Sequence, residues 1–206
     1  MTAVIITHPA NSQGPFCGDQ LAHWQEKGRH FFFAADGLGH GKEAEAAALS
    51  AREFVENGLD SPLEKLFDGC NQHIRNTRGV AMGIAIFDPQ AETVTFAGVG
   101  NISMLILRSN RSANRFSSDP GIVGGGYRRV RPETIPFLRG DLLVLHTDGV
   151  KERMNILAYR RPLLDDLKRL GIQILEDWSR RHDDTGILLY RFDADLQPEE
   201  DGSNGD

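Results

Sequence analysis

The residues from His30 to Gly41 read HFFFAADGLGHG and join a short apolar run to a turn rich in glycine. The run HFFFAA is typical of a buried β-strand, because it is short, apolar and followed by turn residues. It ends at Asp36-Gly37. The residues after Gly41 are rich in Ala, Glu and Leu, which favour a helix from Lys42 to Asn57. This stretch therefore predicts a strand, a tight turn that carries an acid, and a helix.

An acid next to an apolar strand occurs at two further places in the chain. Asp148 follows the predicted strand 141–146, and the pair Asp183-Asp184 precedes the predicted strand 186–192. Carboxylates at strand ends converge if the strands end on the same side, and they then repel one another unless cations neutralise them. Hard ions such as Mg²⁺ or Mn²⁺ prefer oxygen ligands. A single Asp-Gly pair is often a simple turn, so the prediction of a metal site depends on three acidic strand ends together.

The other segments predict an α+β domain built in layers, without alternating βαβ units. Ser61 is a candidate N-cap of a second helix, with proline at the first helical position. Short β-prone runs follow from Val80 onwards, and the glycine-rich residues 121–126 predict a flexible loop among them. Residues 161–180 have the apolar spacing of a helix, which Gly171 is expected to interrupt.

Length and composition indicate one globular domain with an acidic tail. The chain has 206 residues, of which 40% are hydrophobic and 25% charged. We expect a single domain over residues 1–192 and a disordered tail over residues 193–206, which hold six acids and no bases. Without that tail, acids and bases balance at 23 each. A nucleic-acid binder would need a basic surface instead.

The sequence gives no sign of a membrane segment or a disulfide framework. No apolar run approaches the roughly 20 residues that span a bilayer, and the first residues lack the pattern of a signal peptide. Cys17 and Cys70 are the only cysteines, which fits a reducing compartment. We therefore expect a soluble, cytoplasmic monomer.

Three segments of the chain, in this order, resemble the signature blocks of the PPM-type (SpoIIE-like) serine/threonine phosphatases. They are residues 35–41, 140–150 and 183–189. Gly18-Asp19 and Ala97–Asn101 resemble two further blocks, so that the likeness covers nearly the whole chain.

Within this family, the sequence is most similar to the stand-alone RsbX-type phosphatases of bacterial stress signalling. We expect no attached sensor or receiver domain, and the stretch from Gly121 to Gly124 fits that subgroup.

The resemblance implies a four-layer αββα sandwich of two antiparallel sheets flanked by helices, with two Mn²⁺ or Mg²⁺ ions at one end. Asp36 would bridge the ions, and the carbonyl oxygen of Gly37 would hold the second one. Asp148 and Asp183 would complete the shell of the first ion, and Asp184 would orient that shell as a neighbour.

Two more residues receive roles from the resemblance. Asp19 would act on the second ion through water, or on a third, more weakly held ion. His40 could protonate the leaving alkoxide or could simply shape the turn. The ions would activate a water for attack on phosphorus, so that no cysteine nucleophile is needed.

One departure from the family pattern concerns phosphate binding. The eukaryotic-type members have an arginine shortly before the first acidic block, and residues 9–19 contain none. The phosphate would then be held chiefly by the metals, and binding of the substrate would rely on docking of the partner protein. Arg128, Arg129 and Arg131 form a basic cluster that could recognise that partner, although a solvated strand face is the favoured alternative.

The resemblance implies an enzyme that hydrolyses phosphoserine or phosphothreonine on a bacterial signalling partner, and by likeness a STAS-domain protein of the stress response. A general protein phosphatase stays open, and the alternative of another class is a catalytically inactive, phosphatase-like binding module. A nucleotide-binding loop is rejected, because the glycines from Gly37 to Gly41 are one residue too close for G-x-G-x-x-G and Lys42 is followed by glutamate.

Overall fold

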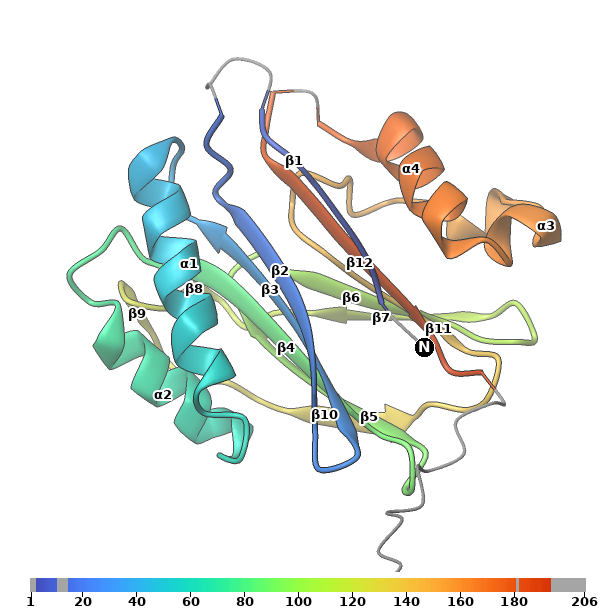
Figure 1. The fold of residues 1–206 in the computed structure, drawn as a ribbon, viewed down its shortest axis with the longest axis horizontal. Coiled ribbons are helices and arrows are strands. Elements are labelled where there is room, and N and C mark those ends of the chain that lie inside the picture. The colour runs from blue at the N-terminus through green and yellow to red at the C-terminus, as the bar shows by residue number, and fades with distance from the viewer. Residues whose placement is uncertain (1–2, 11–14, 181, 194–206) are drawn as a thin grey trace, which may run out of the picture.

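The computed structural model describes residues 3–10, 15–180 and 182–193. Its strands form two antiparallel sheets of five strands each, packed face to face (Figure 1). The first sheet has the order β10-β5-β4-β3-β2, with the bounds Glu133–Pro136, Thr93–Val99, Val80–Asp88, Arg29–Gly37 and Asp19–Glu26. The second has the order β1-β12-β11-β6-β7, with the bounds Val4–His8, Thr185–Arg191, Leu142–His146, Ser103–Leu107 and Ala113–Ser117.

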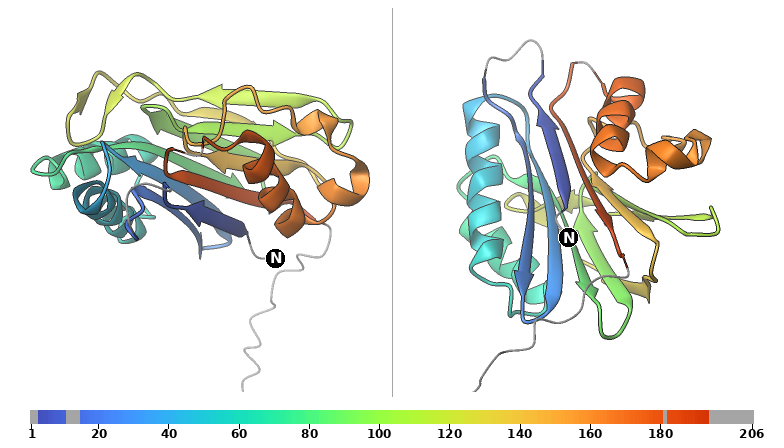
Figure 2. Two further views of the ribbon diagram at one scale, coloured as in Figure 1. Left: turned by 90° about the horizontal axis from the view of Figure 1, so that it is seen from above. Right: turned by 45° about the vertical axis from the view of Figure 1, so that its right-hand side comes forward.

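Helices cover the outer faces of both sheets. The helices α1 (Lys42–Glu56) and α2 (Leu63–His73) lie on the first sheet, and α3 (Arg161–Leu164) and α4 (Leu167–Trp178) lie on the second. Figure 2 shows the resulting order of helix, sheet, sheet and helix. A short 3₁₀ turn, Ile156–Ala158, precedes α3. The predicted four-layer αββα sandwich is therefore confirmed.

Three apolar layers hold the sandwich together. One lies between the two sheets, one between the first sheet and its helices, and one between the second sheet and its helices. Aromatic and aliphatic side chains such as Phe32, Phe87 and Leu143 fill the space between the two sheets. Each fully buried side chain of this size stabilises the fold by about 1.5–3 kcal/mol. The buried face of α1 consists largely of alanines, for example Ala47 and Ala51. Small side chains let this helix lie close to β3, the strand that carries Asp36.

Two local predictions are wrong. Ser61 does not cap the second helix, because α2 begins at Leu63 and its N-cap residue is Pro62, which makes no side-chain cap hydrogen bond. The glycine-rich residues 121–126, predicted as a flexible loop among the strands, contain paired residues instead. They build a small hairpin in which β8 (Gly121–Ile122) pairs with β9 (Gly126–Tyr127).

The predicted helix over residues 161–180 is interrupted, but not at Gly171. The break lies at Asp165 and Asp166, between α3 and α4, and Gly171 is buried inside α4. A Cβ at this position would lie 2.8 Å from Cδ1 of Ile6 and 3.0 Å from Cδ1 of Leu189. Glycine is therefore used here for close packing of the helix on β1 and β12.

No helix in the described part of the chain is long and apolar enough to cross a membrane. Cys17 and Cys70 are both free, and burial raises the pKa of each thiol to about 12. A thiol with such a pKa is a poor nucleophile at neutral pH. The predicted acidic tail lies outside the described residues, apart from Asp193.

A buried histidine predicts how stability depends on pH. His30 lies between the sheets against Phe32, Phe87 and Tyr190, and its Nδ1 is 3.0 Å from Nε2 of His23. Burial, together with the neighbouring His23, lowers the pKa of His30 from 6.5 to about 4. Below pH 6.5 the unfolded chain takes up a proton that the folded chain does not bind, so this contribution to stability is lost as the pH falls towards 4.

We expect His30→Phe to lose less stability than the wild type between pH 7 and pH 5, by about 1–2 kcal/mol. Urea unfolding at the two pH values measures this difference. An equal loss in both proteins would contradict the assignment to His30.

Candidate active site

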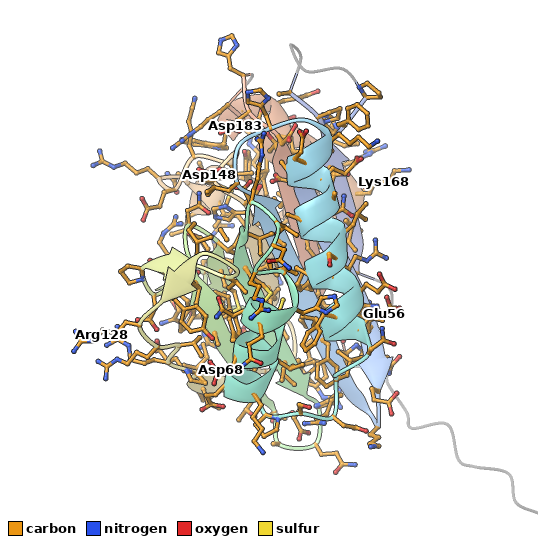
Figure 3. All side chains as sticks on the ribbon, turned by 90° about the vertical axis from the view of Figure 1, so that its left-hand side faces the viewer. Glu56, Asp68, Arg128, Asp148, Lys168 and Asp183 are labelled. Atoms are coloured by element: carbon orange, nitrogen blue, oxygen red, sulfur yellow. The ribbon has the colours of Figure 1, made fainter. Side chains whose placement is uncertain are left out.

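The two sheets bring four acidic segments to the same end of the sandwich. Asp19 begins β2 and is paired directly with Asp36, the penultimate residue of β3. Asp148 follows β11, and Asp183 and Asp184 precede its antiparallel neighbour β12. Figure 3 shows Asp148 and Asp183 together at one end of the molecule, away from Glu56 at the end of α1. The predicted convergence of strand ends is therefore present.

Asp184 joins the two sheets at this end. Its side chain is buried, with Oδ1 accepting a hydrogen bond from the backbone N–H of Ala10 at 2.8 Å and Oδ2 from that of Gly18 at 2.6 Å. Ala10 follows β1 in the second sheet, whereas Gly18 precedes β2 in the first. Both carboxylate oxygens of Asp184 already accept backbone hydrogen bonds. Asp184 is therefore better suited to orient its neighbours than to bind a metal ion directly.

Asp19 is held by Thr147. The hydroxyl of Thr147 donates to Oδ2 of Asp19 and accepts a hydrogen bond from the backbone N–H of Gly186 at 2.9 Å. Asp19 is only 2% exposed. Its position is thus fixed by a residue from the other sheet, which the sequence does not place near it.

Asp148 and Gly37 are each held by a hydrogen bond to a residue from another segment of the chain. The Nδ2 of Asn101 donates to Oδ2 of Asp148 at 2.8 Å. The N–H of Gly37 donates to the carbonyl oxygen of Gly18 at 3.0 Å. A Cβ at Gly37 would lie only 2.1 Å from the carbonyl oxygen of Ala44 in α1, so only glycine fits here.

The carboxylates raise one another's pKa. Burial, and then the charges of Asp148 and Asp183, raise the pKa of Asp36 to about 7. Burial and the charge of Asp36 hold the pKa of Asp19 well above its usual range, although the hydrogen bond from Thr147 opposes this. The pKa of Asp183 is raised by burial and by Asp148. The site therefore concentrates negative charge that the fold does not neutralise by itself.

This donor set suits a hard divalent cation. In the described residues, no three His, Cys, Asp or Glu side chains surround a common point as the ligands of one ion would. Carboxylates that meet at one end of the sandwich repel one another, and a bound cation would offset that repulsion. The strand ends supply only oxygen donors, from Asp36, Asp148, Asp183 and the backbone of Gly37, which is the chemistry that Mg²⁺ and Mn²⁺ prefer. The residues fit such ions.

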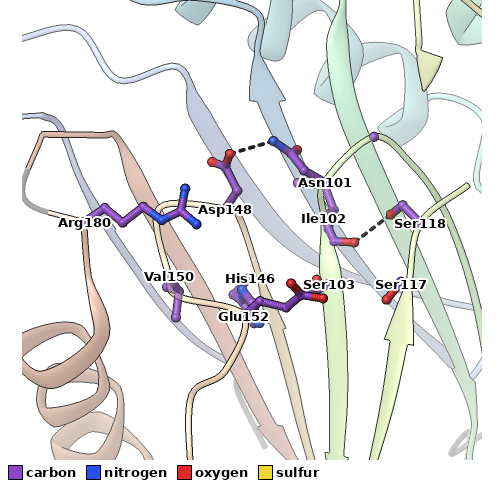
Figure 4. Close-up of a pocket in the computed structure, with 11 residues that line it drawn as sticks. Asn101, Ile102, Ser103, Ser117, Ser118, His146, Asp148, Val150, Glu152 and Arg180 are labelled. Carbon is purple, nitrogen blue, oxygen red and sulfur yellow. Dashed lines mark hydrogen bonds between the residues drawn. The ribbon is translucent and has the colours of Figure 1, made fainter. Parts of the chain in front are cut away.

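A cleft of about 320 Å³ opens beside Asp148 along the outer face of the second sheet (Figure 4). Strands β6, β7 and β11 form its floor, and the segments after β11 and α4 form its rim. It is lined by Gly100, Asn101, Ile102, Ser103, Ser117, Ser118, His146, Asp148, Val150, Glu152 and Arg180.

The remaining predicted site residues lie at the surface. His40 is exposed on the turn before α1, and its proposed proton transfer stays a prediction. Arg131 pairs with Asp119, and both line a pocket together with Arg128 and Arg129. The predicted role of this cluster in partner recognition also stays a prediction.

Sequence reasoning missed the residues that hold or flank the acids. Thr147 and Asn101 lie inside the quoted signature blocks, and their polar side chains next to an acid or a glycine were the available signal. Arg180 carries no such signal, because it follows a helix as an ordinary surface arginine.

An αββα sandwich with acids at one end of its central sheets defines the class of PPM-type phosphatases. The profile of the family described as stage II sporulation protein E (SpoIIE) matches residues 26–193, and the chain belongs to this family. It is similar to the phosphoserine phosphatase RsbX of Bacillus subtilis (strain 168), with 26% identity over 148 residues, which cover 70% of this chain and 73% of that protein.

Solved structures agree with this assignment. A chain from a structure of the bacterial stressosome, described as a modular system adapted to control secondary messenger signalling, superposes with a TM-score of 0.83 and 29% identity over 92% of this chain and 98% of its own length. RsbX in complex with magnesium gives a TM-score of 0.77 at 21% identity, over 91% of this chain and 92% of that one, and shows the shared fold. The predicted class, a protein-serine/threonine phosphatase, is confirmed, and nothing in these comparisons supports the inactive binding module.

The repulsion within the site predicts the effect of removing one charge. Above pH 7, Asp36→Asn should stabilise the metal-free protein by about 1–2 kcal/mol, because an amide replaces a carboxylate that is costly to ionise there. Added Mn²⁺ should raise the melting temperature of the wild type and have little effect on the variant. Thermal unfolding at pH 8, with and without Mn²⁺, measures both effects. A variant that is less stable than the metal-free wild type would contradict the electrostatic account.

Proposed function

We propose that this protein uses divalent cations to remove phosphate from phosphoserine or phosphothreonine on a partner protein. The observation that carries this proposal is the meeting of acids from both sheets at one end of the sandwich, with the pKa of Asp36 raised to about 7 by burial and by its neighbours. Family membership and the likeness to RsbX support the type of reaction.

In this proposal, each acid has the role that the resemblance implies. Asp36 and the carbonyl oxygen of Gly37 would hold one ion, and Asp36, Asp148 and Asp183 the other. Asp19 would act through water or on a third ion. Bound there, the cations would lower the pKa of a water that attacks phosphorus and would offset the charge of the phosphate oxygens.

The chain's other residues keep these groups in place. Asn101 fixes one oxygen of Asp148, and Thr147 fixes one oxygen of Asp19. Asp184 links the segment after β1 to the segment before β2, because it accepts hydrogen bonds from the backbone N–H groups of Ala10 and Gly18. His40 is exposed on the turn beside Asp36 and would donate a proton to the leaving serine oxygen.

We further propose that the substrate is a phosphorylated STAS-domain protein of bacterial stress signalling. The similarity to RsbX and to a chain of the stressosome structure supports this choice. The protein would act as a cytoplasmic monomer, without nucleic acid or membrane.

Hydrolysis of p-nitrophenyl phosphate tests the activity. We expect turnover with Mn²⁺ and loss of turnover when the metal is chelated. Equal, background-level rates in both samples would contradict the proposed function.

Replacement of one ligand tests the site. Asp148→Asn should lower turnover by at least about 100-fold, because an amide loses the charge that binds a cation. Its circular dichroism spectrum should stay unchanged. Asp165→Asn, an exposed acid beside α3, is the matched control and should keep full activity. An active Asp148→Asn protein would refute the ligand assignment.

Loss of phosphate from candidate partners tests the substrate. Phosphorylated STAS-domain proteins incubated with the enzyme and Mn²⁺ should lose 80 Da (about the mass of HPO₃) per phosphoserine in intact mass spectra. A generic phosphopeptide treated alike should react more slowly. Equal rates on both substrates would favour a general protein phosphatase.

A further inference from the structure

Arg180 is anchored between two of the acidic segments. Its backbone N–H donates to the carbonyl oxygen of Gly149 at 2.7 Å, next to Asp148. Its carbonyl oxygen accepts a hydrogen bond from the N–H of Asp183 at 3.0 Å. The backbone of Arg180 is therefore fixed relative to both acids, although its side chain is exposed.

The side chain of Arg180 points towards the acids without being bound by them. Figure 4 shows it extending from the segment after α4 towards Asp148 at the mouth of the cleft. Burial and Asp148 raise the pKa of Asp183, and the charge of Arg180 opposes a small part of that rise. Among the described residues, however, no carboxylate oxygen lies within 4.0 Å of its guanidinium, whereas Arg108 and Arg131 each have an acidic partner.

An unpaired guanidinium in this position is suited to an anion. Its N–H donors form a planar fork that matches two oxygens of a phosphate. Among the residues that the structure describes, it is the one lysine or arginine that lines the cleft. A phosphate that approaches the acids meets repulsion from several carboxylates, and residues 9–19 supply no arginine to oppose it.

We propose that Arg180 binds the phosphate oxygens of the substrate, at the boundary between the acidic site and the cleft. This inference rests on the proposed phosphatase function and adds to it a residue that recognises the substrate. The cleft below, with Ser103, Ser117 and His146 on its floor, would then receive the part of the partner next to the phosphorylated residue.

Arg180→Ala and Arg180→Lys test the proposal in steady-state kinetics with p-nitrophenyl phosphate and Mn²⁺. For Arg180→Ala we expect about a tenfold rise in KM and in the inhibition constant of inorganic phosphate, as the loss of a charge-assisted contact implies. Lysine keeps the charge without the fork and should restore part of the loss. Unchanged values for both constants would overturn the proposal.

A second readout separates phosphate binding from an effect on the acids. If Arg180 acted only by tuning Asp183, the Mn²⁺ concentration for half-maximal activity would change and phosphate inhibition would not. That outcome would also overturn the proposal. Arg153→Ala removes an exposed charge that follows Glu152 in the chain but does not line the cleft, and it should leave all constants unchanged.

Arg78 is the competing candidate, beside the turn that follows Asp36. It lies over Gly39, where a Cβ would be 2.7 Å from its Nη1, and 3.7 Å from a carboxylate oxygen of Glu43. A rise in both constants for Arg78→Ala, with none for Arg180→Ala, would move the role to Arg78.

Calorimetric titration with inorganic phosphate in the presence of Mn²⁺ does not need turnover. If the wild type binds phosphate more tightly than Arg180→Ala but hydrolyses nothing, the proposed function fails and the phosphate site stands. If the wild type is active and the variants bind phosphate equally, only the role of Arg180 fails.

Discussion

Repulsion between carboxylates at one end of the sandwich is the constraint on which the rest of this structure depends. Burial and neighbouring charge raise the pKa of Asp19, Asp36 and Asp183, so the fold is strained electrostatically where these acids meet. Such an arrangement persists only if other interactions stabilise it. The apolar layers between and around the sheets provide that stability. Cations bound at this end, as proposed above, would offset the repulsion between these charges.

The backbone at this end is held by contacts that only small residues permit. The side chain of Asp184 accepts hydrogen bonds from backbone N–H groups of segments from both sheets. A Cβ at Gly149 would lie 2.0 Å from the carbonyl oxygen of Asp184. A Cβ at Gly37 would meet the first turn of α1. The glycines that follow Asp36 and Asp148 therefore have a steric cause, which is the close approach of strand, helix and turn.

In the proposed site, the residues that hold the acids and the residue that binds the phosphate lie in different places. Residues between the strand ends, such as Thr147 and Asn101, keep the acids in place through hydrogen bonds. Arg180 lies at the rim, where a charged side chain stays hydrated and is available to a substrate. This division explains how a site that attracts cations can also admit a phosphate.

The sequence by itself determined the central strands, the first helix and the acids at the strand ends, because continuous apolar runs and Asp-Gly turns are local signals. It did not predict β1, β2, β7 or β10, which are the four edge strands of the two sheets. Edge strands are partly exposed and lack a continuous apolar run. Only the tertiary structure decided which residues meet: Thr147 with Asp19, Asp184 with Ala10, and Arg180 with the mouth of the cleft. These contacts join residues far apart in the chain, and their geometry depends on the register of both sheets, which no local pattern encodes.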